Sequence, residues 1–393
     1  AVHPTVHRGL HGAPRGGQCA VGRASADRPR RRRAAAVGRV TGLPGPSMGI
    51  QEIATVTGLS KSTVSRALRG MSTVADTTID EVRRVADELG YVPSSAAAGL
   101  ATGRQRAIGV VVPVIDRWFY VKALGGVDAE LRRAGYDLVL YNLGGPGGDR
   151  DRAFRRSMLR HRVDGLVLLS LVLDETERAE LELTRHPMIV IGGPAPGLRN
   201  VGVDDVAVAG VAVEHLCGLG HRDVAYVGGQ DEAGMNVAVP WLRRDGFVDA
   251  LAARGIAVRE DWILDGRFSF AGGVDAGEAL FGRRDECRGV GRDGAWPTAV
   301  FCASDEMALG VVLAARRAGL SVPEDVSVIG IDGHEYGEVA GLTTIAQDPV
   351  AQGRVAARAV LAEVDGGLAG PLPASPAHLV VRSTTGPPRA VRA

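Results

Sequence analysis

From residue 108 onward the sequence alternates between short apolar runs and longer helical patterns, and this alternation decides the class of fold. Ile108–Pro113 is a continuous apolar run, typical of a parallel strand that is buried on both faces. Further runs of this kind are Leu138–Tyr141, Gly165–Leu169, Met188–Ile191, Val224–Val227, Ala299–Cys302 and Val326–Ile331. The helical patterns between them include Val121–Ala134, Asp205–Leu219, Trp241–Arg254 and Asp305–Ala318. Repeated strand–helix units predict parallel sheets, and residues 107–387 are long enough for two such α/β subdomains.

Between residues 50 and 89 the apolar residues instead follow the period of a helix. Three apolar faces are formed by Ile50, Ile53, Ala54 and Leu59, by Val64, Ala67 and Leu68, and by Ile79, Val82, Val85, Ala86 and Leu89. Gly58 is placed where a first helix would end, and Ser60 can cap the next helix. The pattern predicts a small all-α domain over residues 48–92, with a tight turn between its first two helices.

The first two of these helices have the residue types of a helix-turn-helix. Such a motif needs a small residue in the turn, apolar residues that join the helices, and polar residues on the outer face of the second helix. Gly58 supplies the first of these, and Leu59 with Val64 supplies the second. The outer face carries hydroxyl and cationic groups that suit phosphates and the acceptor edge of guanine, from Lys61, Ser62, Ser65 and Arg66. On spacing alone, an ordinary helical hairpin with a solvated polar face remains an alternative.

Residues 1–47 show neither helical nor strand periodicity and are rich in Gly, Pro and Arg. The segment contains nine Arg against one Asp, although the whole chain of 393 residues has a net charge of only +1. This composition predicts a disordered basic tail. Two interpretations remain open: the tail adds non-specific attraction to DNA, or it is an upstream extension without a role and Met48 is the working start.

Composition and motifs argue against several other classes of protein. The four cysteines have no metal-ligand spacing, and no apolar run approaches the ~20 residues that span a bilayer. No dinucleotide-binding glycine motif, phosphate-binding loop, nucleophile elbow or zinc-protease motif occurs, so we predict that the chain is not an enzyme and holds no metal or cofactor. An extracytoplasmic sugar-binding protein is a further alternative, but it would carry a secretory signal in place of the helices at residues 50–89. We therefore predict a cytoplasmic protein.

Short sequence motifs are spread along the whole chain. In the N-terminal part they are Ile53-Ala54, Gly58-Leu59-Ser60, Thr63-Val64-Ser65-Arg66 and Leu89-Gly90-Tyr91. Later blocks lie at residues 219–222, 246–247, 297–301, 305–310, 322–330 and 342–345. In their order and spacing these blocks resemble the LacI/GalR family of bacterial transcription regulators. The resemblance implies a helix-turn-helix headpiece, a hinge over residues 93–106, and a core of the periplasmic-binding-protein-like type I over residues 107–387. A short C-terminal tail, residues 388–393, follows.

The resemblance also implies which residues contact DNA. Lys61, Ser62 and Arg66 fall where the family reads bases, while Ser60, Thr63, Ser65 and Arg69 fall where it mostly contacts phosphates. Leu100 holds the position of the hinge leucine that the family inserts into the minor groove. Ser94, Ala98 and Gly99 depart from the family's hinge, and Gly99 weakens helix formation, so we expect a hinge that folds only on DNA.

For the core, the resemblance implies a ligand cleft at the carboxyl ends of the strands. The expected effector-binding residues are Asp116, Phe119, Arg243, Phe268, Ser304 and Asp332. A carboxylate and a guanidinium can hold neighbouring hydroxyls while an aromatic face covers a sugar ring, so the expected effector is a sugar or a sugar derivative. Ser304 and Gly192 depart from the commoner Asn and Asp of the family, which implies a different hydroxyl pattern. Alternatives also remain: Arg243 and Asp332 form an ion pair that bridges the subdomains, and Phe268 belongs to the core.

Together these features predict a sequence-specific DNA-binding repressor that is controlled by its small ligand. We expect a homodimer on a pseudopalindromic operator, because one headpiece makes too few contacts for specific binding and two hinges must pair. Residues 386–393 contain no apolar heptad, so no tetramer is expected. Asp332 and Arg243 are expected to reach one cleft from different parts of the chain, so that a ligand touching both holds the subdomains closed and shifts the hinges.

Overall fold

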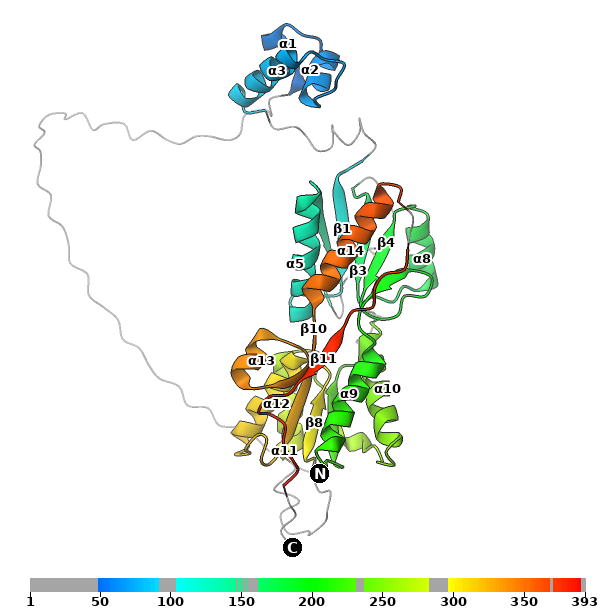
Figure 1. Ribbon diagram of the computed structural model, residues 1–393, viewed down its shortest axis with the longest axis vertical. Helices are drawn as coiled ribbons and strands as arrows, with labels where there is room; N and C mark the ends of the chain where they lie inside the picture. The colour runs from blue at the N-terminus through cyan, green and yellow to red at the C-terminus, as the bar shows by residue number, and fades with distance from the viewer. Residues whose placement is uncertain are drawn as a thin grey trace, which may run out of the picture. The chain divides into compact units, whose positions relative to one another are not determined.

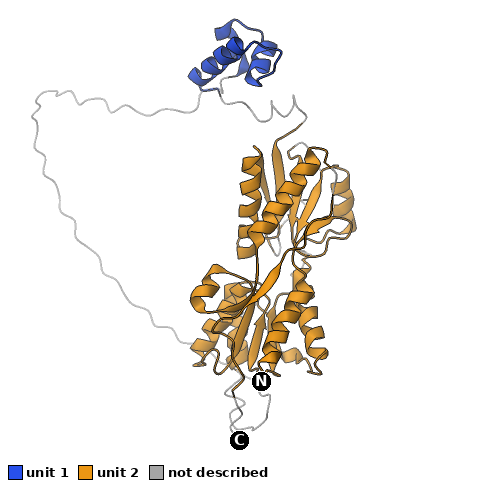
Figure 2. Cartoon of the chain, in the orientation of Figure 1, with its two compact units in different colours: residues 1–92 blue, residues 93–393 orange. Residues whose placement is uncertain are grey.

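The computed structural model describes residues 49–91, 104–145, 148, 150, 154, 162–230, 237–282, 296–367 and 370–389. The chain divides into two compact units, residues 1–92 and residues 93–393, which are coloured separately in Figure 2. Each unit is described by itself below. The predicted tail at residues 1–47 and the hinge position Leu100 lie outside the described residues.

In the first unit three short helices enclose a small apolar core (Figure 1). They are α1 (Ile50–Thr57), α2 (Lys61–Leu68) and α3 (Asp76–Glu88). The helix α1 ends at Gly58, whose φ of 66° lies in the left-handed region that glycine adopts without a Cβ penalty. The side chain of Ser60 caps α2 by accepting a hydrogen bond from the backbone N–H of Thr63 at 3.1 Å. The three helices expected from the apolar spacing are therefore present.

The second unit contains two sheets, and the first of them is entirely parallel. Its strands are β1 (Ala107–Val112), β2 (Asp137–Asn142), β3 (Gly165–Leu169), β4 (Met188–Ile191) and β5 (Arg199–Val201), in the spatial order β2-β1-β3-β4-β5. One face packs on α5 (Trp118–Arg133) and α14 (Pro349–Val364), and the other packs on α8 (Glu175–Glu182). Because both faces are covered, β1 and β3 are apolar throughout. We call this sheet with its three helices the first subdomain.

The second sheet has the order β11-β10-β9-β8-β6-β7, and only its edge strand β11 is antiparallel. Its strands are β6 (Val224–Gly228), β7 (Ile263–Asp265), β8 (Ala299–Cys302), β9 (Ser327–Asp332), β10 (Thr343–Gln347) and β11 (Ala377–Val380). The helices are α9 (Asp205–Gly218), α10 (Val239–Ala252), α11 (Phe270–Gly282), α12 (Asp305–Arg317) and α13 (Glu335–Ala340), with a 3-10 turn at Glu260–Trp262. We call this group the second subdomain. The predicted fold class, a helical headpiece followed by two parallel-sheet subdomains, is confirmed.

The described chain passes between the two subdomains three times: before α9, between β10 and α14, and between α14 and β11. The helix α14 therefore covers the first sheet although it follows β10 of the second (Figure 1). It lies unusually close to α5. A Cβ on Gly126 would lie 2.1 Å from the carbonyl oxygen of Val350, and one on Gly353 would lie 2.2 Å from that of Ala123. These two glycines therefore permit the contact that fixes α14 on the first subdomain.

Candidate functional site

The helix α2 presents the predicted DNA-contacting residues outside the core of the headpiece. Val64 and Ala67 are fully buried, whereas Lys61, Ser62, Arg66 and the C-cap residue Arg69 are exposed. Ser60 is exposed as well, and Thr63 and Ser65 are half-buried. A helix with this division can pack through one side and offer hydroxyl and guanidinium donors to a partner through the other.

Local contacts hold several of these side chains in place. The Ser60 hydroxyl lies 2.8 Å from the hydroxyls of both Ser62 and Thr63. Arg66 and Arg69 each donate from Nε to the carbonyl oxygen four residues earlier, at 3.2 and 3.0 Å. The two guanidinium groups are thereby held against α2.

A pocket between the two subdomains is lined by five of the six predicted effector residues. These are Phe119, Arg243, Phe268, Ser304 and Asp332. The pocket encloses about 970 Å³ of open space, which includes solvent at its mouth. The sixth residue, Asp116, does not line it: its side chain is 71% exposed and pairs with Arg117 at 2.7 Å. The chain turns Asp116 outward just before α5, and Arg117 takes the place at the pocket wall.

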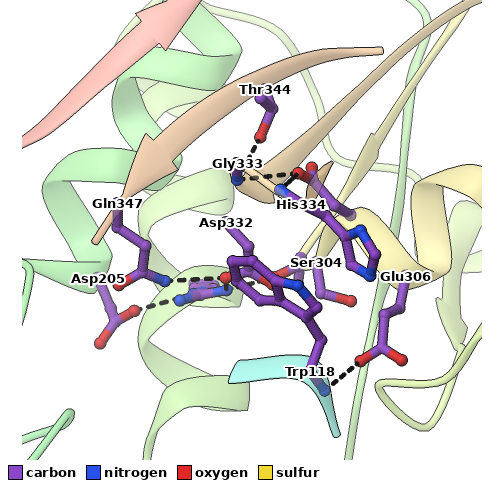
Figure 3. A network of polar contacts seen from close by, with 12 residues as sticks. Trp118, Asp205, Ser304, Glu306, Asp332, Gly333, His334, Thr344 and Gln347 are labelled. Carbon is purple, nitrogen blue, oxygen red and sulfur yellow. Dashed lines mark hydrogen bonds and ion pairs between the residues drawn. The ribbon is translucent and has the colours of Figure 1, made fainter. Parts of the chain in front are cut away.

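Arg243 lies in a buried polar cluster on the second subdomain. Its Nε donates to Oδ1 of Asp205 at 2.8 Å, and Nη1 donates to the carbonyl oxygen of Ala303. Nη1 also lies 3.8 Å from Oδ1 of Asp332. Figure 3 shows Asp205, Asp332 and Gln347 converging, with Gln347 donating to Asp332 at 2.8 Å. Opposite charges and hydrogen bonds compensate the burial of the ionised groups.

This cluster corrects one expectation about the cleft. Arg243 lies on α10 and Asp332 ends β9, so both belong to the second subdomain. Their ion pair does not bridge the subdomains, and a ligand that touched only these two residues would not hold the subdomains together. Closure requires contacts from the other wall of the pocket, to which Phe119, Tyr120 and Ser170 of the first subdomain contribute.

The backbone of Asp332 is strained. Its φ is 135°, a conformation in which an L side chain such as that of Asp332 is costly. Burial raises the pKa of its carboxyl to about 6, although Arg243 acts in the opposite direction. Strain and desolvation both cost free energy, and such costs concentrate at binding sites.

A second buried carboxylate, Asp305, lies next to Asp332 at the start of α12. Its Oδ2 accepts hydrogen bonds from the backbone N–H groups of Gly333 at 2.9 Å and His334 at 2.8 Å (Figure 3). Asp305 therefore holds the segment that directly follows Asp332. Burial, with the nearby charge of Asp332, raises the pKa of Asp305 to about 7.

We expect the Asp305→Asn variant to lose part of the pH dependence of stability. Since the pKa of Asp305 is raised to about 7 in the folded chain, unfolding releases a proton between about pH 4 and 7. Stability contributed by this group is complete below pH 4 and falls as pH rises to 7, by at most about 1.4 kcal/mol per pH unit. Urea unfolding at pH 5, 6, 7 and 8 should show a flatter profile for Asp305→Asn.

The exposed carboxylate Asp275, paired with Arg267 at 2.5 Å, supplies the control for this comparison. Asp275→Asn should keep the wild-type slope. A profile for Asp305→Asn that ran parallel to the wild type up to pH 7 would contradict the assignment.

Beside the pocket, the start of α5 contacts the second subdomain directly. The ring of Trp118 stacks on His334 with centroids 5.0 Å apart, and its backbone N–H donates to Glu306 at 3.3 Å. Nζ of Lys122 pairs with Glu335 at 2.9 Å. Burial acts to raise the pKa of Glu335, but the hydrogen bonds from Lys122 and Trp118 outweigh it and lower this pKa to about 2. These contacts join the two subdomains at the edge of the pocket, which Glu306 itself lines.

Sequence reasoning missed several pocket residues, namely Ser170, Asp205, Gln347 and Gln352. Ser170 directly follows β3, so the rule that placed Asp332 at a strand end also indicates Ser170. Asp205 and Gln352 instead lie near the starts of α9 and α14, just after the chain passes between subdomains. No local sequence pattern indicates where the chain crosses from one subdomain to the other.

Comparison with known proteins decides the family. Residues 49–94 match the family profile for bacterial regulatory proteins of the lacI family, and residues 213–385 match the profile for periplasmic binding protein-like domains. A transcriptional repressor of Vibrio campbellii, PurR, is 34% identical over 305 residues, covering 76% of this chain and 86% of that protein. This chain belongs to the lacI family. The family resemblance seen in the sequence is therefore confirmed, and the members it matches are DNA-binding transcription regulators.

Other known transcription regulators match over similar lengths. The repressor CytR of Escherichia coli is 32% identical over 321 residues, covering 81% of this chain and 90% of that protein. A lac repressor dimer bound to its operator and an anti-inducer has a TM-score of 0.73 at 25% identity, covering 87% of this chain and all of that one. The regulator CelR in complex with cellobiose has a TM-score of 0.61 at 28% identity, covering 86% of this chain and 99% of that one.

No helix within the described part of this lacI-family chain is long and apolar enough to cross a membrane. The described residues also contain no group of three or more His, Cys, Asp or Glu that could hold a metal ion.

Proposed function

We propose that this lacI-family chain is a transcriptional repressor whose affinity for operator DNA is set by a small ligand bound between its two core subdomains. One observation carries the proposal: the same chain has a helix-turn-helix with exposed donors and a pocket lined from both subdomains. The proposed division is a headpiece over residues 48–92, a hinge over 93–106 and an effector core over 107–387. The boundary between compact units after residue 92 supports it.

On DNA, the exposed side of α2 is proposed to enter the major groove. Lys61, Ser62 and Arg66 would read bases, whereas Ser60, Thr63, Ser65 and Arg69 would bind phosphates. Leu100, outside the described residues, is proposed to insert into the minor groove. The protein acts as a homodimer on a pseudopalindromic operator, as the operator-bound dimer of the similar lac repressor supports.

The proposed effector is a sugar or a sugar derivative. The aromatic rings of Phe119, Tyr120 and Phe268 line the same pocket as the charged cluster around Arg243. Aromatic faces cover the apolar side of a sugar ring, while carboxylate and guanidinium groups bind neighbouring hydroxyls. The cellobiose complex of CelR supports this class of ligand. The chain acts on DNA in the cytoplasm and needs neither catalysis nor a cofactor for this function.

The test combines DNA binding with ligand binding. In a gel-shift assay the full chain should bind specifically to the DNA that flanks its own gene. Thermal-shift screening against sugars and nucleosides should then find a compound that stabilises the core, by about 2.7 kcal/mol at one hundred times its Kd. Adding that compound should change operator affinity. Equal binding to all DNA sequences would contradict the regulatory function, and stabilisation by none of these compounds would contradict the sugar or sugar derivative.

A further inference from the structure

Gln352 carries a buried hydrogen-bond acceptor that the pocket residues discussed so far do not satisfy. It lies on α14, lines the pocket, and is only 2% exposed. Its Nε2 donates to Oε1 of Gln347 at 3.0 Å. Its Oε1 is buried and has no hydrogen-bond partner among the residues that the structure describes.

The orientation of Gln352 follows from the charge of Asp332. An ionised carboxylate only accepts hydrogen bonds, so Gln347 must present its Nε2 to Asp332, as it does at 2.8 Å. Gln347 then presents its Oε1 to Gln352, so Gln352 must donate a hydrogen bond from its own Nε2. The amide oxygen of Gln352 is therefore the end of this chain of hydrogen bonds. If the amide of Gln352 were flipped, its Oε1 would face Oε1 of Gln347, and both atoms are acceptors.

An unsatisfied acceptor in such a place is costly. A buried polar atom without a partner loses its hydration without compensation, and nearly all such atoms in folded proteins are paired. Here the residue that carries the acceptor lines a pocket that can hold a small molecule. A donor group on a bound molecule would recover the lost hydrogen bond.

We propose that Gln352 is a specificity-determining residue of the effector pocket, whose Oε1 accepts a hydrogen bond from a hydroxyl or N–H group of the effector. The inference rests on the proposed effector function and adds a requirement to it: the effector has a donor on the side that faces α14. Gln352 belongs to the first subdomain and Asp332 to the second. A ligand that bound both residues would therefore contact both subdomains.

The test compares Gln352→Met with the wild type as full-length chains. Methionine keeps the length of the side chain and removes the acceptor. Gln105→Met, a half-buried glutamine that does not line the pocket, is the matched control. The probes are D-glucose, D-galactose, D-ribose, cellobiose, adenosine and hypoxanthine, measured by isothermal titration calorimetry. For the compound that binds the wild type, we expect affinity to fall about 10-fold in Gln352→Met and to stay unchanged in Gln105→Met.

Monodeoxyfluoro analogues of a sugar that binds identify the donor. Fluorine takes the place of one hydroxyl and cannot donate a hydrogen bond. For the wild type, one analogue should bind about 10-fold more weakly than its parent sugar. In Gln352→Met, that analogue and its parent should bind equally. Unchanged affinity of Gln352→Met for the parent, or an equal loss for the analogue in both proteins, would overturn the inference.

The inference and the proposed sugar effector fail in different ways. If only hypoxanthine binds, the sugar is wrong, and the loss in Gln352→Met is measured with that compound. If none of the probes binds, urea unfolding of the ligand-free proteins decides. Gln352→Met removes the unsatisfied acceptor but also the hydrogen bond to Gln347, so it is compared in a Gln347→Met background, where that hydrogen bond is already absent. There Gln352→Met should leave the unfolding midpoint unchanged. A clearly lower midpoint would show that Oε1 already has a partner, which overturns the inference.

Discussion

Replacing Arg243 by methionine is expected to lower the free energy of unfolding of the core by about 3–5 kcal/mol at pH 8. The side chains of Arg243, Asp205 and Asp332 are each less than one-tenth exposed, and Arg243 is the cation that contacts both carboxylates. Without it, two negative charges would remain buried next to each other. The loss of stability should be measured by urea unfolding, with circular dichroism as the signal.

The adjacent Arg244 provides a matched control. Its side chain is 44% exposed and lies 3.6 Å from Glu260, so Arg244→Met should cost no more than about 1 kcal/mol. The loss in Arg243→Met should also be smaller at pH 5 than at pH 8. Asp332 already has its pKa raised to about 6, so at pH 5 it takes up a proton and its unpaired charge disappears. Equal stability of the two variants would show that the cluster around Arg243 is solvated.

The second large effect is expected on DNA, where Arg66→Ala should weaken operator binding by about 1–3 kcal/mol. Arg66 is exposed on α2 and takes no part in the headpiece core, so its removal should leave the fold intact. A guanidinium can donate two hydrogen bonds to the acceptor edge of guanine. The loss should therefore be confined to operators that keep the base pair it reads, and fluorescence anisotropy with singly substituted operators would reveal which one.

Arg84 on α3 is a suitable comparison for Arg66. It is exposed and pairs with Glu88 within its own helix at 2.6 Å. Arg84→Ala should leave the base preference unchanged, whatever small effect it has on overall affinity. If Arg66→Ala weakened binding to all sequences alike, Arg66 would bind phosphate and the proposed base contact would be wrong.

The sequence predicted the central strands well because a strand covered on both faces must be apolar along its whole length. Gly165–Leu169, Met188–Ile191 and Ala299–Cys302 were predicted with the bounds that the structure shows. The three-residue strands β5 and β7 were not predicted, since three residues carry no readable period. The strand β10 (Thr343–Gln347) was missed as well, because Thr-Thr-Ile-Ala-Gln is not a continuous apolar run. So was the antiparallel strand β11. Its half-buried and exposed residues lie at an edge of the sheet, where little apolar character is required.

Pocket residues at the ends of strands could be predicted from the sequence. Those next to the segments that connect the two subdomains could not. Asp332 ends a strand and Ser304 closely follows one, and the carboxyl ends of parallel strands face the ligand cleft in this class of fold. Asp205 and Gln352 could not be located in this way, because their positions depend on where the chain passes between subdomains. Asp116 shows a further limit of prediction from the sequence. In the irregular segment before α5, Asp116 points into solvent while the next residue, Arg117, lines the pocket, and no sequence pattern distinguishes the two.

The route of α14 also affects how the protein is made. All five strands of the first sheet have been synthesised once Val201 is added, but the helix that covers part of one face begins only at Pro349. At ordinary bacterial elongation rates of roughly 5–20 residues per second, the ribosome needs on the order of ten seconds to reach it. Until then, the apolar residues Ile108, Val110 and Val167 lack the cover that Ala356 and Val360 later provide. The nascent chain thus passes through a stage in which part of one face of this sheet lacks its covering helix, and a fragment ending before Pro349 would remain at that stage.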